Sequence, residues 1–391
     1  MMDTESTSGD KHSCLGDTGV DDFLTHYWQK KPLLIRDAFP GLQSPISADE
    51  LAGLSCEEHV NARLVLEKDG EYPWQVEFGP FEESRFSALP KSHWSLLVSD
   101  VEKHLPETRS LLKHFRFIPD WRVDDLMISY APEGGSVGAH TDAYDVFLIQ
   151  LSGQRLWKIA ESYIEETLTD VDLCILKNFT AEDEWLMNPG DMLYLPPNVA
   201  HHGIALSNAE ACLTASVGFR APSLKTITSD YINYLNENYH DETRYHDRAA
   251  ARPGHHAEIS EETVAHFIEY LKQGLNIDRT LVRNWLGQYC SDNRTYEDLL
   301  EEQHIADYDQ LATMVSGATL QQSPYSHFLF SYTDENALLF VNGDSYHVSR
   351  RFAESVCEDD HISFQQLEKV MADSDRETLL TLFNNGAISA A

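Results

Sequence analysis

The sequence predicts a mainly β core of the cupin-like jelly-roll type, followed by a helical region and a small C-terminal α+β domain. Between residues 125 and 220, short β-rich runs alternate with turn residues, which is typical of antiparallel sandwiches and barrels. After Pro222 the apolar residues follow helical spacing. Residues 291–391 combine short helices with a β-hairpin, which is typical of a winged-helix module.

Turn residues delimit the expected strands of the β-rich region. The strands are predicted over 126–130, 146–151, 156–159, 192–195 and 213–219. Turn residues, mostly glycine and proline with Ser152 and Asp191, separate them at 134–135, 152–153, 189–191 and 196–197, because these residues favour turns and interrupt regular structure. Antiparallel strands at this spacing favour a jelly roll.

The N-terminal part mixes helices and strands. Residues 1–18 are rich in Ser, Thr, Asp and Gly and are expected to form a disordered tail. Apolar spacing predicts a helix from Asp21 onward. Further strands are predicted over 33–35, 64–66 and 74–78, and a helix over 94–104.

Helical patterns dominate after the β-rich region. Helices are predicted over 224–239, 260–275 and 279–288, with a polar break at 241–256. In the last part, strands are expected over 327–332 and 337–340, a hairpin turn at Asn342 and Gly343, and helices over 364–371 and 376–383. The predicted divisions are a tail 1–18, a catalytic domain 19–222, a helical region 223–290 and a winged-helix-like domain 291–391.

The charge balance constrains the partners. The formal net charge is −35, from 64 acidic and 29 basic residues. Proteins that grip nucleic acid usually carry basic patches, so free nucleic acid is a poor candidate partner. A basic protein is a better one, although acidity alone also maintains solubility. The six cysteines form no CxxC pair, the N-terminus lacks a signal-peptide pattern, and no apolar run approaches ~20 residues, so we expect a cytoplasmic protein without a membrane span.

One histidine pattern points to a metal site. Among 18 histidines, only His140 is followed two residues later by an aspartate, Asp142. Residues i and i+2 of a strand share a face, so both side chains are expected to point into the mouth of the barrel. His201, after the predicted strand 192–195, supplies a second imidazole, with His202 as a competing choice. Two imidazoles and one carboxylate form the facial triad of non-haem Fe(II) oxygenases, which leaves coordination positions open. The alternative is that the side chains of His140 and Asp142 only make hydrogen bonds that stabilise a turn.

Two further residues are candidates for binding a 2-oxo acid. Arg155 begins the predicted strand after Gly153, and an inward guanidinium is able to form a bidentate pair with a carboxylate. Ser129 lies on the strand before the histidine pattern and offers a hydroxyl. On spacing alone, the simpler interpretation is that Arg155 is exposed at the surface and that Ser129 is a core residue whose hydroxyl is hydrogen-bonded within the protein.

These residues occur in stretches that resemble the bacterial JmjC-type ribosomal oxygenases, and among them the arginine hydroxylases of the sixteenth large-subunit ribosomal protein. The matching stretches are 27–32, 61–64, 124–129, 134–135, 140–142, 144–147, 189–191, 196–197, 201 and 216–222. The resemblance covers about residues 20 to 225 and is looser afterwards. Ala200 and His202 depart from the family pattern, but neither removes a ligand.

The resemblance carries specific implications. It implies a double-stranded β-helix, a helical dimerisation region that makes a homodimer, and a winged-helix-like C-terminal domain. His140, Asp142 and His201 match the metal ligands, which favours His201 over His202. Arg155 and Ser129 match the 2-oxoglutarate-binding residues. The implied reaction uses Fe(II), 2-oxoglutarate and O2 to hydroxylate an arginine side chain of a basic large-subunit ribosomal protein.

Substrate residues and competing functions stay open. Carboxylates that are candidates for holding the arginine guanidinium are Asp120 and Asp145, together with Asp124, Asp125 and Glu133. Composition does not separate hydroxylation from demethylation of this or another basic protein. A cupin metalloenzyme that does not use 2-oxoglutarate is a further alternative. A regulator that binds DNA through the C-terminal domain is the last, although that domain is acidic.

Overall fold

We describe a computed structural model of the chain. It describes residues 14–391 except 68–73, 170, 208–209, 239–242, 247–254, 256 and 276. Most of the expected tail and of the expected polar break therefore lies outside the described residues. The chain divides into two compact units, Met1–Ala221 and Pro222–Ala391. Within the described residues, no helix is both long and apolar enough to cross a membrane.

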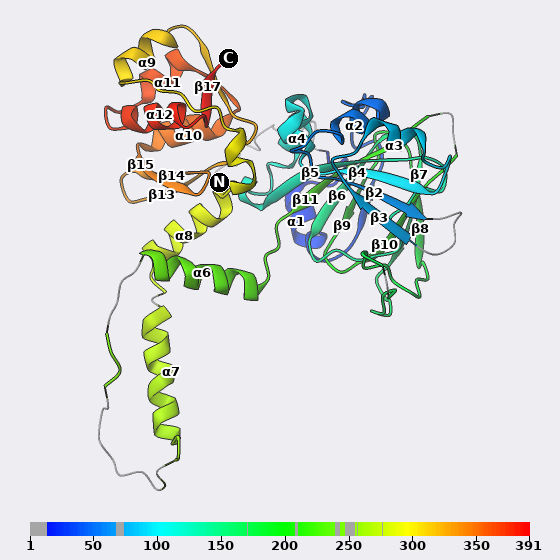
Figure 1. Cartoon of the computed structure of the whole chain (residues 1–391), viewed down its shortest axis with the longest axis horizontal. Helices are drawn as coiled ribbons and strands as arrows, with labels where there is room; N and C mark the ends of the chain where they lie inside the picture. The colour runs from blue at the N-terminus through cyan, green and yellow to red at the C-terminus, as the bar shows by residue number, and fades with distance from the viewer. Residues whose placement is uncertain are drawn as a thin grey trace, which may run out of the picture. The chain divides into compact units, whose positions relative to one another are not determined.

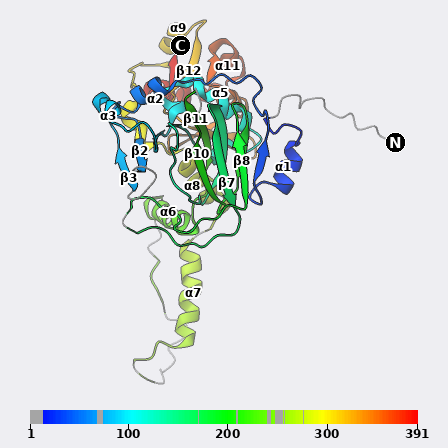
Figure 2. The same cartoon turned by 90° about the vertical axis from the view of Figure 1, so that its right-hand side faces the viewer.

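The first unit is built on two antiparallel sheets (Figure 1). The larger sheet has the strand order β1 (Leu33–Ile35), β9 (Met192–Leu195), β6 (Asp145–Ser152), β11 (Cys212–Phe219), β5 (Val123–Ala131), β4 (Trp94–Val98), β2 (Ala62–Glu67) and β3 (Trp74–Phe78). The smaller sheet has the order β10 (Ala200–Ala205), β7 (Arg155–Ala160) and β8 (Asp183–Met187), which lie side by side in Figure 2.

The two faces of the large sheet have different roles. One face packs under the N-terminal helices, around Phe23, Phe115 and Phe147. The other face meets the small sheet through an apolar layer that includes Leu148, Trp157 and Leu193. Successive residues of a strand point to opposite faces of the sheet. They therefore lie alternately in the core under the N-terminal helices, which we call the structural core, and in the interior between the two sheets. The predicted jelly roll is confirmed by this arrangement.

Short helices cover the first face and the ends of the strands. Those with α-helical geometry are α1 (Val20–His26), α2 (Ala48–Leu54), α3 (Glu83–Ser87), α4 (Val101–His104) and α5 (Arg109–Leu112). Turns of 3₁₀ helix are η2 (Pro106–Thr108), η3 (Lys113–Phe115) and η4 (Asp120–Arg122). Ser47 and Glu50 form a capping box at the start of α2, which explains where that helix begins.

The predicted helix over 94–104 is wrong. Its first half is strand β4, which is buried along its whole length between β2 and β5. Only α4 is helical, and it begins after Asp100 turns the chain with a φ of 56°. A continuous apolar run of this length fits a buried helix or a buried central strand equally, so pairing with both neighbours decided the outcome.

The second unit begins with helices. These are α6 (Leu224–Asn238), α7 (Glu261–Leu275) and α8 (Arg279–Ser291), and all three were predicted. Tyr231, Leu235 and Trp285 make a small core between α6 and α8, and the indole of Trp285 donates to Asp230 over 2.7 Å. Within its described residues, α7 buries no side chain.

The rest of the second unit is the predicted winged-helix-like domain. Its helical elements are η5 (Arg294–Leu299), α9 (Tyr308–Met314), α10 (Arg350–Glu358), α11 (Phe364–Val370) and α12 (Asp375–Asn384). Its strands form two sheets, β16 (His361–Ser363), β12 (Thr319–Gln322) and β17 (Ile388–Ala390), and β13 (Phe328–Tyr332), β14 (Ala337–Val341) and β15 (Asp344–Val348). Asn342 and Gly343 have φ values of 52° and 88°, so the predicted two-residue hairpin turn is confirmed.

Glu102 on α4 is a buried carboxylic acid that lies beside β5. One of its carboxylate oxygens accepts a hydrogen bond from the backbone N–H of Leu126 on β5 over 3.0 Å. Burial, followed by the charge of Asp100, raises the pKa of Glu102 from 4.5 to about 8. The folded protein therefore holds this proton more tightly than the unfolded chain does.

We expect Glu102→Gln to stabilise the protein at high pH. Because the folded pKa is raised, the contribution of Glu102 is most favourable below pH 4.5 and is lost as the pH rises through about 8. Glutamine keeps the acceptor but removes the charge, so the variant should gain roughly 2–4 kcal/mol near pH 9 and almost nothing near pH 4.5. Thermal unfolding across this range measures the difference, with the exposed Glu107→Gln as the control. A gain that does not change with pH would contradict the ionisation argument.

Candidate metal and co-substrate site

His201 lies on β10, a strand that the sequence did not reveal. β10 pairs with β7 so that His201, Gly203 and Ala205 face Ile159, Trp157 and Arg155. His201 is 3% exposed and belongs to the interior between the sheets. His202 alternates to the opposite face of β10, where its ring lies 6.2 Å from that of Phe179. The strand geometry therefore separates the two competing histidines.

His140 reaches the site in a different way from the one predicted. It makes an isolated β-bridge to His201, with backbone hydrogen bonds of 3.0 and 2.9 Å in the two directions. Asp142 lies beyond the bridge in irregular chain, where its carbonyl accepts a hydrogen bond from Asn198 N–H over 2.7 Å. His140 and Asp142 point the same way, as expected, but only His140 is in a β-bridge and no regular strand continues through Asp142.

Gly138 makes this approach possible. Its φ is +82°, and a Cβ atom there would lie 2.9 Å from the side chain of Ile175. A side chain would meet both a strained backbone and a steric clash, so glycine is required two residues before the first ligand.

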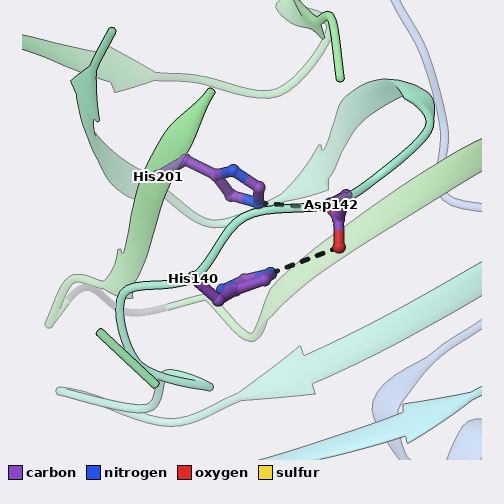
Figure 3. Close-up of side chains that lie close together, drawn as sticks. All are labelled: His140, Asp142 and His201. Carbon is purple, nitrogen blue, oxygen red and sulfur yellow. Dashed lines mark ion pairs between the residues drawn. The ribbon is translucent and has the colours of Figure 1, made fainter. Parts of the chain in front are cut away.

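The three predicted ligands converge (Figure 3). His201 Nε2 lies 3.5 Å from one carboxylate oxygen of Asp142, and His140 Nε2 lies 4.0 Å from the other. One ligand atom from each residue falls within 4.8 Å of the other two, and the imidazole centroids are 4.2 Å apart. A single ion is therefore able to touch all three side chains.

The hydrogen bonds of the imidazoles prepare them for a metal. Nδ1 of His140 lies 3.0 Å from the carbonyl of Gly138, and Nδ1 of His201 lies 2.9 Å from that of Val199. Donation through Nδ1 leaves each Nε2 lone pair directed at Asp142, as in metal-binding histidines. Burial, with a smaller contribution from His140, lowers the pKa of His201 to about 4, which keeps the ring neutral near pH 7.

Arg155 and Ser129 lie in the interior that the triad adjoins. Arg155 is 5% exposed and pairs with Ala205 at the start of β7. Ala205 packs with Ala131 of β5, which is two residues from Ser129 and on the same face. Among the described residues, the Ser129 hydroxyl makes one hydrogen bond, a long one of 3.4 Å to the carbonyl of Thr214.

The buried guanidinium fits an anionic co-substrate. Within the described part of the chain, Nε and one Nη of Arg155 have no hydrogen-bond partner, although both atoms are buried. An unpaired buried cation is costly unless a ligand completes it. A carboxylate that is bound in the interior would satisfy both donors in a bidentate pair. The residues present thus fit the distal carboxylate of 2-oxoglutarate, and the His–Asp–His set fits a divalent metal with open positions.

Asp145 does not face this interior. It is the first residue of β6 and is 0% exposed. One carboxylate oxygen accepts from Tyr194 Oη over 2.6 Å, and the other lies 3.1 Å from Gln29 Nε2 and 3.3 Å from Arg122 Nη2. The prediction that Asp145 holds the substrate is wrong, because its side chain points to the structural core and is fully engaged there.

The other carboxylates divide by position. Asp120 is exposed on η4, with Arg116 3.9 Å away. Asp125 is on the inner side of β5, and its Oδ1 lies 3.2 Å from the position of a Cβ on Gly218. The ring of Tyr144 approaches the same position to 3.9 Å, and burial, followed by the charge of Asp142, raises the pKa of Tyr144. Asp125 therefore lies near Tyr144, two residues after Asp142 in the chain, which makes it a candidate for binding the substrate.

Two histidines and a carboxylate that converge in a jelly roll are the ligand set of non-haem Fe(II) oxygenases. A model described as the JmjC domain matches residues 110–227, and one described as a ROXA-like winged helix matches residues 271–389. The chain is 38% identical to the Escherichia coli ribosomal protein uL16 3-hydroxylase over 71% of this chain and 73% of that protein. It is 34% identical to a probable ribosomal oxygenase of Haemophilus influenzae over 82% of this chain and 80% of that one. This chain belongs to the JmjC-domain ribosomal oxygenase family.

Solved structures agree with this assignment. Escherichia coli YcfD superimposes with a TM-score of 0.82 at 31% identity, covering 95% of this chain and 98% of that one. Another structure of the same ribosomal oxygenase, in complex with cobalt and 2-oxoglutarate, gives a TM-score of 0.79 over 95% of this chain and 97% of that one. The similarity therefore extends through the second unit, where the sequence resemblance is looser.

We expect His201→Ala to abolish stoichiometric binding of Co(II), used as a probe in place of iron. Removing one of three ligands should weaken binding by about 100-fold or more, because each ligand contributes directly to the affinity of the site. His202→Ala is the matched control and should bind within about threefold of the unmodified protein, because its ring lies on the other face of β10. Titration followed by visible absorption measures both. Equal losses in the two variants would exclude His201 as the specific ligand.

Proposed function

We propose that this chain is an Fe(II)- and 2-oxoglutarate-dependent oxygenase that hydroxylates an arginine side chain of ribosomal protein uL16. Family membership supports the enzyme class. The named substrate of the Escherichia coli relative supports uL16, and the net charge of −35 favours a basic protein partner. We place this activity in the cytoplasm.

One arrangement carries the proposal. On the small sheet, the ligand His201 and the unpaired Arg155 face the same interior, four residues apart in register across β10 and β7. A strand rises about 3.3 Å per residue, so these rows are separated by about 13 Å. A five-carbon dicarboxylate that chelates a metal at one end fits the space between them, with its distal carboxylate on the guanidinium.

Each group in the site has a distinct task. Bound Fe(II), 2-oxoglutarate and O2 would supply the oxidising power for insertion of one oxygen atom into a C–H bond. His140, Asp142 and His201 hold the metal and leave one side of it open. Arg155 and Ser129 orient the co-substrate, and the apolar layer around Leu148, Leu193 and Trp157 excludes water.

Asp125 is the residue that we assign to the substrate guanidinium. It lies on the same face of β5 as Ser129, toward the end of the strand where Tyr144 approaches. Burial, followed by the charges of Asp100 and Asp124, raises its pKa to about 7. A guanidinium beside it would restore the ionised form and gain a charge-assisted hydrogen bond.

The alternative reactions make different products. Demethylation would release formaldehyde and lower the mass of a methylated substrate. Hydroxylation adds one oxygen that stays on the protein. A cupin enzyme that does not use 2-oxoglutarate would form no succinate. The unpaired guanidinium of Arg155 favours a carboxylate co-substrate over that last alternative.

We expect incubation of uL16 with the enzyme, iron and 2-oxoglutarate to add a single oxygen to an arginine, with one succinate formed per modification. Asp125→Asn should raise the KM for uL16 by roughly tenfold or more, because a charge-assisted hydrogen bond is lost. Asp145→Asn should instead lower the unfolding temperature, since Arg122 loses its charged partner and one of the two acceptor oxygens becomes an NH₂ group. Intact mass, peptide mapping and succinate assays measure these outcomes. Succinate formation without any added oxygen on uL16 would exclude it as the substrate.

We further propose that the protein is a homodimer through α7. The apolar residues Val264, Phe267, Ile268 and Leu271 are between 42% and 63% exposed and follow the i, i+3, i+4, i+7 spacing of one helical face. A continuous exposed stripe of this kind is typical of an interaction site. A second copy presents the same stripe, and self-pairing in an antiparallel or crossed arrangement would bury both.

We expect Ile268→Asp and Leu271→Asp to convert a dimer into a monomer. A charge in the centre of an apolar interface is desolvated without a partner, which costs several kcal/mol, so dissociation should become measurable at micromolar protein. Gln273→Asp introduces the same charge on the opposite side of α7 and should leave the dimer intact. Sedimentation velocity reports the mass. If the unmodified protein is already a monomer, the dimer proposal fails while the proposed reaction stands.

A further inference from the structure

Trp157 has an unpaired hydrogen-bond donor inside the jelly roll. Its indole Nε1 is buried and has no partner within the residues that the structure describes, and the side chain is 6% exposed. Tryptophan donates but does not accept, so only an acceptor is able to satisfy this atom. A buried donor without a partner costs free energy, and the guanidinium of Arg155 in the same interior also has unpaired donors, so both call for a physical explanation.

The position of Trp157 supplies that explanation. On the facing strands of the small sheet, the inward pairs run in the order Arg155–Ala205, Trp157–Gly203 and Ile159–His201. The pair that contains Trp157 is therefore the middle one. Any ligand that extends from the metal at His201 to the guanidinium of Arg155 must pass over it.

Packing fixes the indole at this point. A Cβ atom on Gly203 would lie 2.7 Å from the six-membered ring of Trp157, so the absence of a side chain there is what lets the ring lie against β10. The ring centroid is 5.8 Å from the ring of His201 and 5.8 Å from Cζ of Arg155. The indole thus lies between the two ends of the co-substrate site and is in van der Waals or cation–π range of both.

We propose that the indole N–H of Trp157 donates a hydrogen bond to a carboxylate oxygen of bound 2-oxoglutarate, next to the pair made by Arg155. This inference rests on the proposed function, because it names a further residue in the same site. The co-substrate brings two carboxylates, whose oxygens are the strongest acceptors available to a neutral donor. Trp157 then has two roles, an apolar wall through its ring and a positioning contact through its nitrogen.

The direct test observes the indole itself. We would load the full-length protein with Zn(II) in place of iron, label it with ¹⁵N, and record the indole ¹H–¹⁵N resonances while adding 2-oxoglutarate. The Trp157 signal is assigned by its absence in Trp157→Phe. We expect it to move downfield on saturation and its proton to exchange with solvent more slowly, since a new hydrogen bond both deshields and protects it. A Trp157 resonance that does not change at saturation would overturn the inference.

Calorimetry gives an independent measure with a matched control. Trp157→Phe keeps an aromatic wall but loses the donor, and we expect it to bind 2-oxoglutarate roughly tenfold more weakly with unchanged affinity for the metal. Trp185 on β8 is the register partner of Trp157. Trp185→Phe is therefore the matched control, and it should bind 2-oxoglutarate as tightly as the unmodified protein does. Equal affinity in all three proteins would also overturn the inference. If the unmodified protein itself fails to bind 2-oxoglutarate, the proposed function fails, which is a distinct outcome.

Discussion

The reciprocal backbone bridge between His140 and His201 is the interaction on which the site depends. Two hydrogen bonds, of 3.0 and 2.9 Å, tie an irregular segment to the edge strand of the small sheet. The side chains of both bridged residues then project toward Asp142. A slip of one residue along β10 would replace His201 with His202 and turn the imidazole to the opposite face. The metal site is therefore specified by register as much as by residue type.

The alternation of side chains along the strands also separates residues that stabilise the fold from residues that line the site. Outward-facing residues of the large sheet pack under the N-terminal helices, and Asp145 belongs to this side, where Gln29, Arg122 and Tyr194 contact its carboxylate. Inward-facing residues supply the ligands and the donors. Two adjacent residues, Tyr144 and Asp145, thus serve different purposes, although both are polar and both neighbour the histidine pattern.

The sequence was informative where local spacing coincides with chemistry. The single His-x-Asp pattern identified the triad, and turn residues delimited most strands, including β5, β6 and β11. It failed where tertiary pairing decided the outcome. β4 was predicted as a helix, because an apolar run has no distinctive period. β10 was missed, because it begins soon after Pro197 and carries two adjacent histidines and a glycine instead of a clear apolar alternation. Asp145 was indistinguishable from Asp125, because the face of a strand depends on which side the core lies.

The inward direction of the Trp157 side chain could be predicted from the sequence only after Arg155 had been placed. Once Arg155 is placed inward on β7, alternation places Trp157 inward as well. What the sequence cannot show is that the indole nitrogen lacks a partner, because this depends on every strand that surrounds it. Unsatisfied donors in a core are visible only after all the potential acceptors have been located.

The inner face of β5 connects the two ends of the site. Asp125 and Ser129 share that face and are four residues apart, which corresponds to about 13 Å along the strand. We assign Asp125 to the substrate and Ser129 to the co-substrate. The metal ligands would lie between these two positions. β5 pairs with β11 and, over Ile128–Tyr130, also with β4, while a bulge opposite Gly218 interrupts the ladder next to Asp125. This strand would set the distance between the substrate guanidinium and the distal carboxylate of the co-substrate. A metal bound by the triad would then act on a carbon at a set distance from that guanidinium. The selection of one carbon in an arginine side chain would therefore follow from strand geometry and not from any chemical preference of the metal.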